Sequence, residues 1–302
     1  MNILIIGGAG FLGLELVHNL AKSRSNDIYV LDSFRHGSSL INKFPKRKNV
    51  HPPVVGNVRN YHDVYRVIDR DKPDVIVHLA AHITRPESVD KFRSCAEINY
   101  VGMANILDAC TAVRKKPSRI IFASCEAARD PVSHYGISKR ACEDLLNLIA
   151  PLMNIDPVIL RFSEIYGLSR SFTSNSMINF LTDAMILDKD IALFNVNKER
   201  DHVHISDALR AIRLVINYDG EDKLGTLDIG TGENMKIKDL ASKIKKAADY
   251  TGNLIYRESS LIKVTDSIAD ILPAKTALGF KCEADFDTEL VNMIKKRKRE
   301  LK

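Results

Sequence analysis

The sequence has no apolar run as long as the roughly 18 residues that a membrane-spanning helix needs. The apolar stretch near its start, Ile3–Ile6, is too short for the core of a secretory signal peptide, and no basic residues precede it. These absences argue against a membrane protein and against a secreted one. We therefore expect a soluble protein with no membrane partner.

Cysteine is scarce, and the cysteines are not arranged in pairs. The sequence has five of them, spread along the chain without any CxxC spacing: Cys95, Cys110, Cys125, Cys142 and Cys282. An odd number without close pairs argues against a disulfide framework and against a zinc site. We expect no structural disulfide, no bound metal and a reducing, cytoplasmic location.

Charge of one sign is not concentrated in the way that a nucleic-acid-binding surface requires. The formal net charge is +6, which is small for 302 residues. Only Lys295–Arg299 forms a dense basic run, and we interpret it as the exposed end of a last helix, where cations offset the negative end of the helix dipole. A nucleic-acid partner is therefore not expected.

The first half of the chain alternates short apolar runs with amphipathic segments. Runs rich in Ile and Val predict buried strands at Asn2–Ile6, Asp27–Leu31, Asp74–Leu79, Arg119–Ser124 and Asp156–Phe162, with a weaker candidate near Val50–Val55. Helical spacing fills the intervals at Gly10–Ser23, Asn60–Asp69, Arg93–Arg114 and Tyr135–Ala150. This alternation predicts an α/β fold with a parallel sheet covered by helices. After about residue 163 the pieces become shorter and more polar, which predicts a smaller second lobe.

A glycine-rich turn joins the first predicted strand to the first predicted helix. Gly7 and Gly10 allow a tight turn whose backbone N–H groups approach a pyrophosphate, and Gly13 lets the helix pack closely on the strand. Phe11 and Leu12 lie in the first turn of the predicted helix, whose N-terminus adds a favourable potential for an anion. The turn therefore predicts a dinucleotide-binding, Rossmann-type doubly wound sheet.

Asp32 selects between the two nicotinamide dinucleotides. It ends the next predicted strand, 19 residues after Gly13, where a carboxylate bonds the ribose hydroxyls of NAD and repels the 2′-phosphate of NADP. Arg35 lies close enough to accept that phosphate, so NADP remains the alternative. We expect NAD as the cofactor.

Tyr135 and Lys139 open a predicted helix, and their spacing of four residues places them on one face. An ammonium beside a phenol favours the phenolate, so we expect Lys139 to lower the pKa of Tyr135 from its usual value of about 10. Such a tyrosine removes a proton from a sugar hydroxyl while a hydride leaves for the nicotinamide. Lys139 can also bond the nicotinamide ribose.

With these motifs in this order, the chain resembles the extended short-chain dehydrogenase/reductases, the NAD-dependent sugar-nucleotide epimerase/dehydratase family. Further matching segments follow one another in the family's order: His78–Ala81, Asn99–Asn105, Leu160–Gly167, Arg200–Asp207, Leu227–Gly232 and Ala277–Phe280. The resemblance implies an NAD-binding domain formed by residues 1–162 plus about 203–225. It also implies a C-terminal α/β substrate-binding lobe formed by about 163–202 and 226–302.

The resemblance also implies contacts with ligands and with a second copy of the chain. Further cofactor contacts are implied at Asn57, Val58, Leu79, Ala80, Ala81 and Asn99. Arg200 is implied to hold the pyrophosphate of a nucleotide-diphosphate sugar, with further substrate contacts at Glu126, Glu164 and Asn175. The helices at Arg93–Arg114 and Tyr135–Ala150 are implied to form a homodimer interface. Some of its apolar candidates must face the sheet instead; the candidates are Ile98, Val101, Ile106, Leu145, Leu146 and Leu148.

Four departures from the family pattern bear on the chemistry. The family has Ser or Thr where this chain has Cys125, and strand alternation selects Cys125 over Ser124 as the group beside the tyrosine, although a thiol is the weaker donor. Ser124 remains the alternative after a small shift. The dehydratase subgroup continues with Asp-Glu, whereas this chain has Glu126-Ala127 and lacks the base. Glu164 replaces an asparagine and must turn toward a ribose or Arg200 to avoid repelling the pyrophosphate, and Asn57 replaces an aspartate that often holds the adenine amino group.

The resemblance therefore implies an NAD-dependent epimerase that acts at C4 of a nucleotide-diphosphate sugar through a transient 4-keto intermediate. A one-way reductase of a nucleotide-linked 4-keto-6-deoxysugar needs the same residues and is the alternative. A third reading, favoured by Cys125 and Glu164, is a homologue that binds a sugar nucleotide with weakened chemistry.

Overall fold

The computed structural model describes residues 1–84, 91–171, 176–258 and 266–301. The chain folds into two compact units. Unit 1 comprises Met1–Arg161, Ser169–Thr173 and Ala211–Leu227, and unit 2 comprises Phe162–Leu168, Ser174–Arg210 and Asp228–Lys302.

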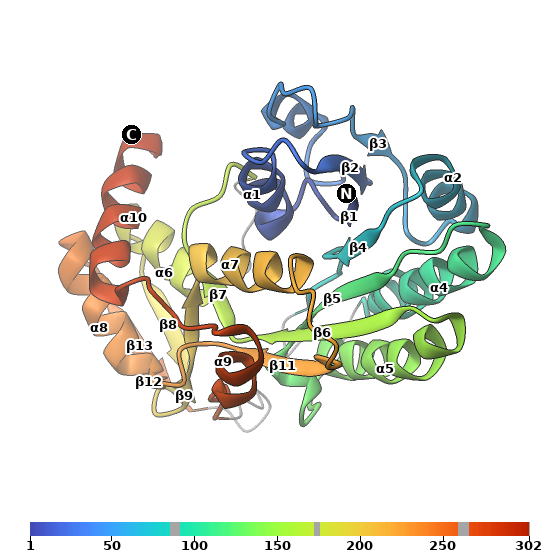
Figure 1. The fold of residues 1–302 in the computed structure, drawn as a ribbon. Coiled ribbons are helices and arrows are strands. Elements are labelled where there is room, and N and C mark those ends of the chain that lie inside the picture. The colour runs from blue at the N-terminus through green and yellow to red at the C-terminus, as the bar shows by residue number, and fades with distance from the viewer. Residues whose placement is uncertain (85–90, 172–175, 259–265, 302) are drawn as a thin grey trace. The chain divides into compact units, whose positions relative to one another are not determined.

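Most of unit 1 is built on a seven-stranded sheet with the strand order β11-β6-β5-β4-β1-β2-β3 (Figure 1). The strands are β1 (Asn2–Ile6), β2 (Asp27–Asp32), β3 (Val54–Val55), β4 (Val75–His78), β5 (Arg119–Cys125), β6 (Asp156–Phe162) and β11 (Thr226–Ile229). The pairs β1–β2, β1–β4, β2–β3 and β4–β5 run parallel. The sheet confirms the predicted α/β fold with a Rossmann-type doubly wound parallel sheet.

Helices cover the sheet because their apolar faces pack against its apolar side chains. The helices are α1 (Phe11–Leu20), α2 (Tyr61–Asp71), α3 (Phe92–Cys95), α4 (Gly102–Ala112) and α5 (His134–Ile149), with 3-10 turns at Ser38–Lys43, Glu126–Ala128 and Ala150–Met153. A further helix, α7 (Ile205–Ile216), is divided between the two units. In Figure 1, α2, α4 and α5 lie on one face of the sheet and α1 on the other. The helix predicted over Arg93–Arg114 is divided into α3 and α4 by a π-helical turn at Ala96–Val101.

Strand register brings the predicted cofactor residues to one edge. Ile6 pairs with Leu31 on one side and with His78 on the other, and His78 pairs with Phe122. Because these strands are parallel, the residues that follow them leave the sheet at the same edge. The glycine turn, Asp32, the loop after β4 and the end of β5 therefore lie side by side.

Unit 2 has an apolar core of its own. Its strands pair in twos: β7 (Glu164–Tyr166) with β10 (His202–His204), β8 (Ile191–Phe194) with β13 (Leu254–Arg257), and β9 (Glu199–Arg200) with β12 (Met235–Lys236). Its helices are α6 (Met177–Ile186), α8 (Ile237–Ala248), α9 (Leu272–Leu278) and α10 (Phe286–Glu300). Leu181, Leu240 and Ile294 are among the buried residues that join α6, α8 and α10.

The six apolar residues proposed for a homodimer surface do not share one environment. Ile106 and Leu146 are fully buried in the core of unit 1, so they are among the candidates that face the sheet and not an interface. They face the sheet because they lie on the inner faces of α4 and α5. Ile98 and Leu145 are partly buried against the same core, whereas Val101 and Leu148 are exposed.

Within the described residues, no helix is both long enough and apolar enough to cross a membrane. The same part of the chain contains no group of three or more His, Cys, Asp or Glu side chains placed to hold a metal ion. All five cysteines are free thiols.

Helix α1 packs so closely on the glycine turn that a substitution at Gly13 should change the stability of the protein. Alanine in a helix interior usually stabilises by about 1 kcal/mol over glycine. A Cβ at Gly13, however, would lie 2.2 Å from the carbonyl oxygen of Gly7. We therefore expect Gly13→Ala to lower the free energy of unfolding by roughly 1–3 kcal/mol, as overpacking does.

Gly102 on α4 is the matched control, because a Cβ there would meet only the Val58 side chain, at 3.0 Å. Gly102→Ala should cost less than Gly13→Ala in the same denaturant unfolding experiment. A Gly13→Ala protein as stable as the wild type would contradict this close packing.

Candidate active site

The glycine turn is shaped by backbone contacts that leave no room for side chains. Gly7 has a φ of +90°, and a Cβ on it would lie 2.5 Å from the Ala80 nitrogen in the loop after β4. The N–H of Gly7 donates to the Leu31 carbonyl, and the N–H of Gly10 to the Gly7 carbonyl. Helix α1 starts directly afterwards, with no capping side chain and no acid in its first turn. Its first N–H groups, at Phe11 and Leu12, are thus placed for an anion.

Asp32 lies beside this turn at the end of β2. Its carboxylate accepts hydrogen bonds from the Ala9 N–H (2.9 Å) and from the Phe34 N–H (2.8 Å). One side chain therefore holds the glycine turn and places a negative charge where the sequence predicted the adenosine ribose.

Arg35 is engaged elsewhere than at Asp32. Its Nη1 donates to Nδ1 of His82, in the loop after β4, at 3.0 Å. Burial and the charge of Arg35 lower the pKa of His82, which keeps the ring neutral and able to accept this bond. This contact engages only one of the N–H donors of Arg35 and directs that side of the guanidinium toward His82.

The loop after β4 is fixed by Asn99. The Leu79 and Ala80 N–H groups both donate to the Ile6 carbonyl, and Ala81 continues the loop. The Asn99 amide accepts from the His82 N–H (2.7 Å), and it donates to the His82 carbonyl and to the Ser138 hydroxyl. Asn99 is thus occupied by protein groups, and it ties the loop to helix α5.

Asn57 and Val58 follow β3. The side-chain oxygen of Asn57 accepts a hydrogen bond from the backbone N–H of Arg59 at 3.0 Å, so part of the hydrogen-bonding capacity of this side chain is used within the chain. Val58 is buried against the core, and its carbonyl accepts from the Asn105 amide. Both residues lie at the same end of the sheet as Asp32, because β3 pairs with the end of β2.

Tyr135, Lys139 and Cys125 come together at the end of β5. Tyr135 and Lys139 lie one turn apart on α5, which Ser133 caps by accepting from the Gly136 N–H. The Lys139 ammonium is 5.8 Å from the centre of the Tyr135 ring, and it donates to the Ala123 carbonyl at 2.5 Å. The Cys125 thiol lies close enough to the Tyr135 hydroxyl for each group to shift the pKa of the other.

Ser124 points away from this cluster. It is buried, and its hydroxyl donates to the Glu143 carboxylate, which Arg161 also binds. Of the two alternatives at the end of β5, the structure brings Cys125 to the tyrosine and leaves Ser124 in a separate polar network.

Burial dominates the electrostatics of the cluster. It raises the pKa of Tyr135 well above its ordinary value, and the neighbouring thiols Cys125, Cys95 and Cys142 add to the effect. Burial also lowers the pKa of Lys139 and raises that of Cys125 to about 11. The expected lowering of the Tyr135 pKa by Lys139 is therefore not found here, because desolvation of the phenolate outweighs the nearby ammonium.

The predicted substrate residues belong to different units. Glu126 lies in unit 1, in the 3-10 turn after Cys125. In unit 2, Arg200 lies on β9, paired with Met235. Asn175 lies outside the described residues.

Glu164 faces a helix rather than Arg200. Its carboxylate accepts from the Ser176 hydroxyl and the Met177 N–H at the start of α6, and it lies 3.7 Å from the His202 ring. A carboxylate at a helix N-terminus is electrostatically favourable. The structure therefore gives Glu164 a capping contact that the sequence did not predict.

Sequence reasoning assigned no role to Glu143, Arg161 or His78, although Arg161 and His78 lie in segments that match the family. Glu143 lies eight residues after Tyr135, so a spacing of four repeated twice was a signal that it shares the face of Tyr135 and Lys139. His78 is fully buried, and burial with the nearby Lys139 charge lowers its pKa to about 3. Neither ring nitrogen of His78 has a hydrogen-bond partner among the described residues, and no sequence signal marked this.

Comparisons with known proteins show what the chain as a whole is similar to. Residues 3–230 match the model of the NAD dependent epimerase/dehydratase family. A protein of Methanocaldococcus jannaschii named "Putative UDP-glucose 4-epimerase" is 28% identical, over 98% of this chain and 99% of that one. A dTDP-4-dehydro-6-deoxyglucose reductase of Escherichia coli is 24% identical, over 97% and 96%. The crystal structure of a Bacillus cereus UDP-glucuronic acid 4-epimerase, in complex with UDP-glucuronic acid and NAD, shares the fold with a TM-score of 0.89 at 22% identity, over 99% of this chain and 100% of that one.

The family match spans well over half of the chain, and the chain therefore belongs to the NAD dependent epimerase/dehydratase family. The cofactor of the family is NAD, as the glycine turn and Asp32 predicted. The residues present fit NAD. Gly7 has no Cβ, which would collide with the backbone at Leu79 and Ala80, so the turn keeps its backbone accessible. Helix α1 presents uncapped N–H groups, and Asp32 supplies an acceptor for ribose hydroxyls.

We expect the protein to bind NAD more tightly than NADP, because Asp32 repels a 2′-phosphate and Arg35 is held by His82. Asp32→Asn keeps an acceptor for the Ala9 N–H but removes the charge. The ratio of the NAD affinity to the NADP affinity should therefore fall by about tenfold, the size of effect expected when a hydrogen bond to a charged group is lost. Calorimetric titration with both dinucleotides measures this. Arg35→Ala is the control and should leave the NAD affinity nearly unchanged, whereas tighter binding of NADP by the wild type would show that Arg35 governs the site.

Proposed function

We propose that the protein is an NAD-dependent epimerase that inverts C4 of a nucleotide-diphosphate sugar through a transient 4-keto intermediate. The observation that carries the proposal is the meeting of Tyr135, Lys139 and Cys125 at the sheet edge that also holds the glycine turn. The likeness to a relative named as a UDP-glucose 4-epimerase over nearly the full length of both chains supports it.

Separate residues would hold the separate parts of NAD. Gly7, Gly10 and the start of α1 would hold the pyrophosphate of NAD, and Asp32 would hold its adenosine ribose. Bound there, NAD supplies the acceptor for the hydride that leaves C4 and the donor that returns it to the other face.

Tyr135 handles the proton in both directions. It accepts the proton of the C4 hydroxyl as the ketone forms and returns it to the oxygen as the ketone is reduced. Lys139 favours the phenolate by its charge, and the Cys125 thiol donates to the reacting oxygen. The proton and the hydride are both returned, so the reaction needs no external reductant.

The units have separate proposed roles. We propose that unit 1 binds the cofactor, and that unit 2 binds the sugar nucleotide with Arg200 on its pyrophosphate. Glu126 lies next to Cys125 and is proposed to contact the sugar.

The second candidate is a reductase of a nucleotide-linked 4-keto-6-deoxysugar. The E. coli relative named as such a reductase favours it, and the same three residues serve it. A weakened homologue that only binds sugar nucleotides is the third candidate, because Cys125 stands where the family has a hydroxyl. The absence of a base at Ala127 argues against a dehydratase.

Mass spectrometry of the purified protein, followed by incubation with UDP-glucose, tests the proposal. The epimerase should carry NAD and form UDP-galactose without added nicotinamide cofactor. A protein that turns over a 4-keto sugar only when NADH or NADPH is added would be the reductase, and one that retains a sugar nucleotide without converting it would be the binding homologue.

Tyr135→Phe should reduce the turnover of an identified substrate by roughly 10²–10⁴-fold, the usual contribution of a general acid–base group. The affinity for NAD, read by calorimetry, should remain nearly unchanged. Because burial raises the pKa of Tyr135, wild-type turnover should also rise with pH through the alkaline range as the phenolate fraction grows. Full activity in Tyr135→Phe would overturn the assignment.

We further propose a homodimer formed along α3–α4 and α5. Phe92, Val101, Ile137 and Leu148 on these helices are exposed apolar side chains, and exposed apolar patches mark interfaces. Light scattering should give about twice the 33.8 kDa of one chain, and Leu148→Glu should give the monomer. Leu272→Glu, on α9 and equally exposed, is the control and should stay dimeric. A wild-type monomer at micromolar concentration would refute the dimer.

A further inference from the structure

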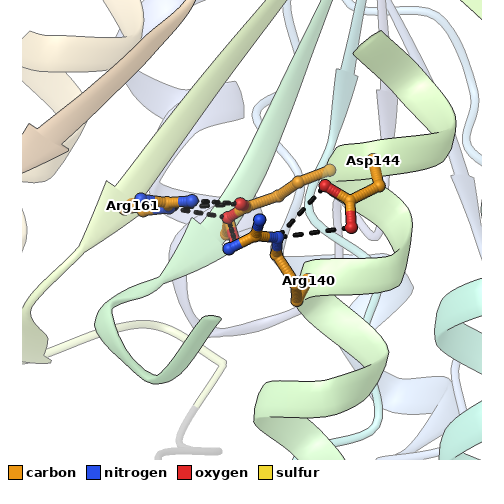
Figure 2. Close-up of polar contacts among 5 residues, drawn as sticks. Arg140, Asp144 and Arg161 are labelled. Carbon is orange, nitrogen blue, oxygen red and sulfur yellow. Dashed lines mark hydrogen bonds and ion pairs between the residues drawn. The ribbon is translucent and has the colours of Figure 1, made fainter. Parts of the chain in front are cut away.

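The polar network behind the proposed site has three members. The Ser124 hydroxyl donates to one carboxylate oxygen of Glu143 at 2.5 Å. Arg161 binds the same carboxylate through Nε, at 3.0 and 3.2 Å, and through Nη2, at 2.5 Å. In Figure 2 the Arg161 side chain reaches from β6 toward α5, the helix that also carries Arg140 and Asp144.

Burial makes this network rigid. The Glu143 side chain is only 2% exposed and that of Arg161 only 17%. The ion pair that Arg140 forms with Asp144, one residue further along α5, has side chains that are 46% and 64% exposed. A buried, fully bonded carboxylate has few other orientations, whereas the exposed pair contributes little to position or stability.

Helix α5 holds the end of β5 at three points. Tyr135, Lys139 and Glu143 follow one another at a spacing of four residues and so share one face of the helix. They contact Cys125, the Ala123 carbonyl and Ser124 respectively. Three consecutive residues of β5 are therefore each held by α5.

Strand geometry couples two of these contacts. Cys125 has extended backbone angles (φ −145°, ψ 162°), and neighbouring side chains on an extended strand point to opposite faces. While Glu143 holds the Ser124 side chain, that side chain cannot reach Tyr135, which lies two turns earlier on α5. The bond at Ser124 thereby determines which group Tyr135 meets.

We propose that Glu143 is a positioning residue for the Tyr135 site: backed by Arg161, it holds Ser124 away from the tyrosine so that the Cys125 thiol faces the reacting oxygen. The inference deepens the proposed function and rests on it for the identity of the reaction. The placement of the thiol can nevertheless be measured without turnover.

The carboxylate has a second effect at the same site. Glu143 opposes the lowering of the Lys139 pKa that burial causes, as do the thiols of Cys125 and Cys142. Its charge thus helps to keep Lys139 protonated beside Tyr135.

The test is the alkylation rate of Cys125 by iodoacetamide in the NAD-free protein, read by peptide mass spectrometry. Ser124→Ala removes the hydrogen bond and leaves the ion pair. Because a hydrogen bond to a charged group is worth about 1.5–3 kcal/mol, we expect labelling of Cys125 to accelerate on the order of tenfold or more. Asp144→Asn is the matched control on the neighbouring residue and should leave the rate unchanged.

Two further variants separate positioning from general loosening. Glu143→Gln keeps an acceptor for Ser124 and should hold the Cys125 rate within about twofold, since the bond is retained. Glu143→Leu combined with Arg161→Met removes the acceptor but leaves no unpaired buried charge, so it should fold and label as fast as Ser124→Ala.

The buried cysteines Cys110 and Cys142 serve as internal references. Acceleration at Cys125 alone supports the proposal. Equal acceleration at all three thiols would show a merely structural role, and an unchanged Cys125 rate in Ser124→Ala would show that Glu143 does not set its placement; either result overturns the inference. Because no substrate enters this assay, its outcome is independent of whether the epimerase assignment holds.

Discussion

The contact on which the rest of the structure depends is the close approach of Gly7 to the backbone at Leu79 and Ala80. A Cβ at Gly7 would lie 2.5 Å from the Ala80 nitrogen, so the turn after β1 and the loop after β4 can lie side by side only if this residue is glycine. The approach fixes the loop that Asn99 then ties to α5, and α5 carries Tyr135 and Lys139. The glycine turn and the pair of Tyr135 and Lys139 are therefore linked through one backbone contact.

Burial is the second constraint, and it works against the charges that the chemistry uses. It raises the pKa of Tyr135 and lowers that of Lys139, so each group is driven toward its neutral form. The charge of Glu143 partly offsets the effect of burial on the pKa of Lys139, since it favours the protonated lysine. The polar network behind β5 thus contributes to the electrostatics of the site as well as to its geometry.

Much of the fold was predictable because its signals are local. Apolar runs marked β1, β2, β4, β5 and β6, and Gly7, Gly10 and Gly13 marked the turn. Strand alternation indicated Cys125 beside Tyr135 but left Ser124 as the alternative. The capping contact of Glu164 and the network of Ser124 with Glu143 and Arg161 were not predictable, because they join residues far apart in the chain whose side-chain directions no local pattern reveals. The pKa of Tyr135 was predicted in the wrong direction, because a sequence shows that a lysine is near but not how deeply the phenol is buried.

The most direct test of the central claim follows deuterium placed at C4 of UDP-glucose through turnover by the NAD-loaded protein, without added reductant. If Tyr135 moves only the proton and the hydride stays within the site, the UDP-galactose formed will keep the deuterium at C4. Loss of the label to water, or a dependence of product formation on added NADH, would contradict the account.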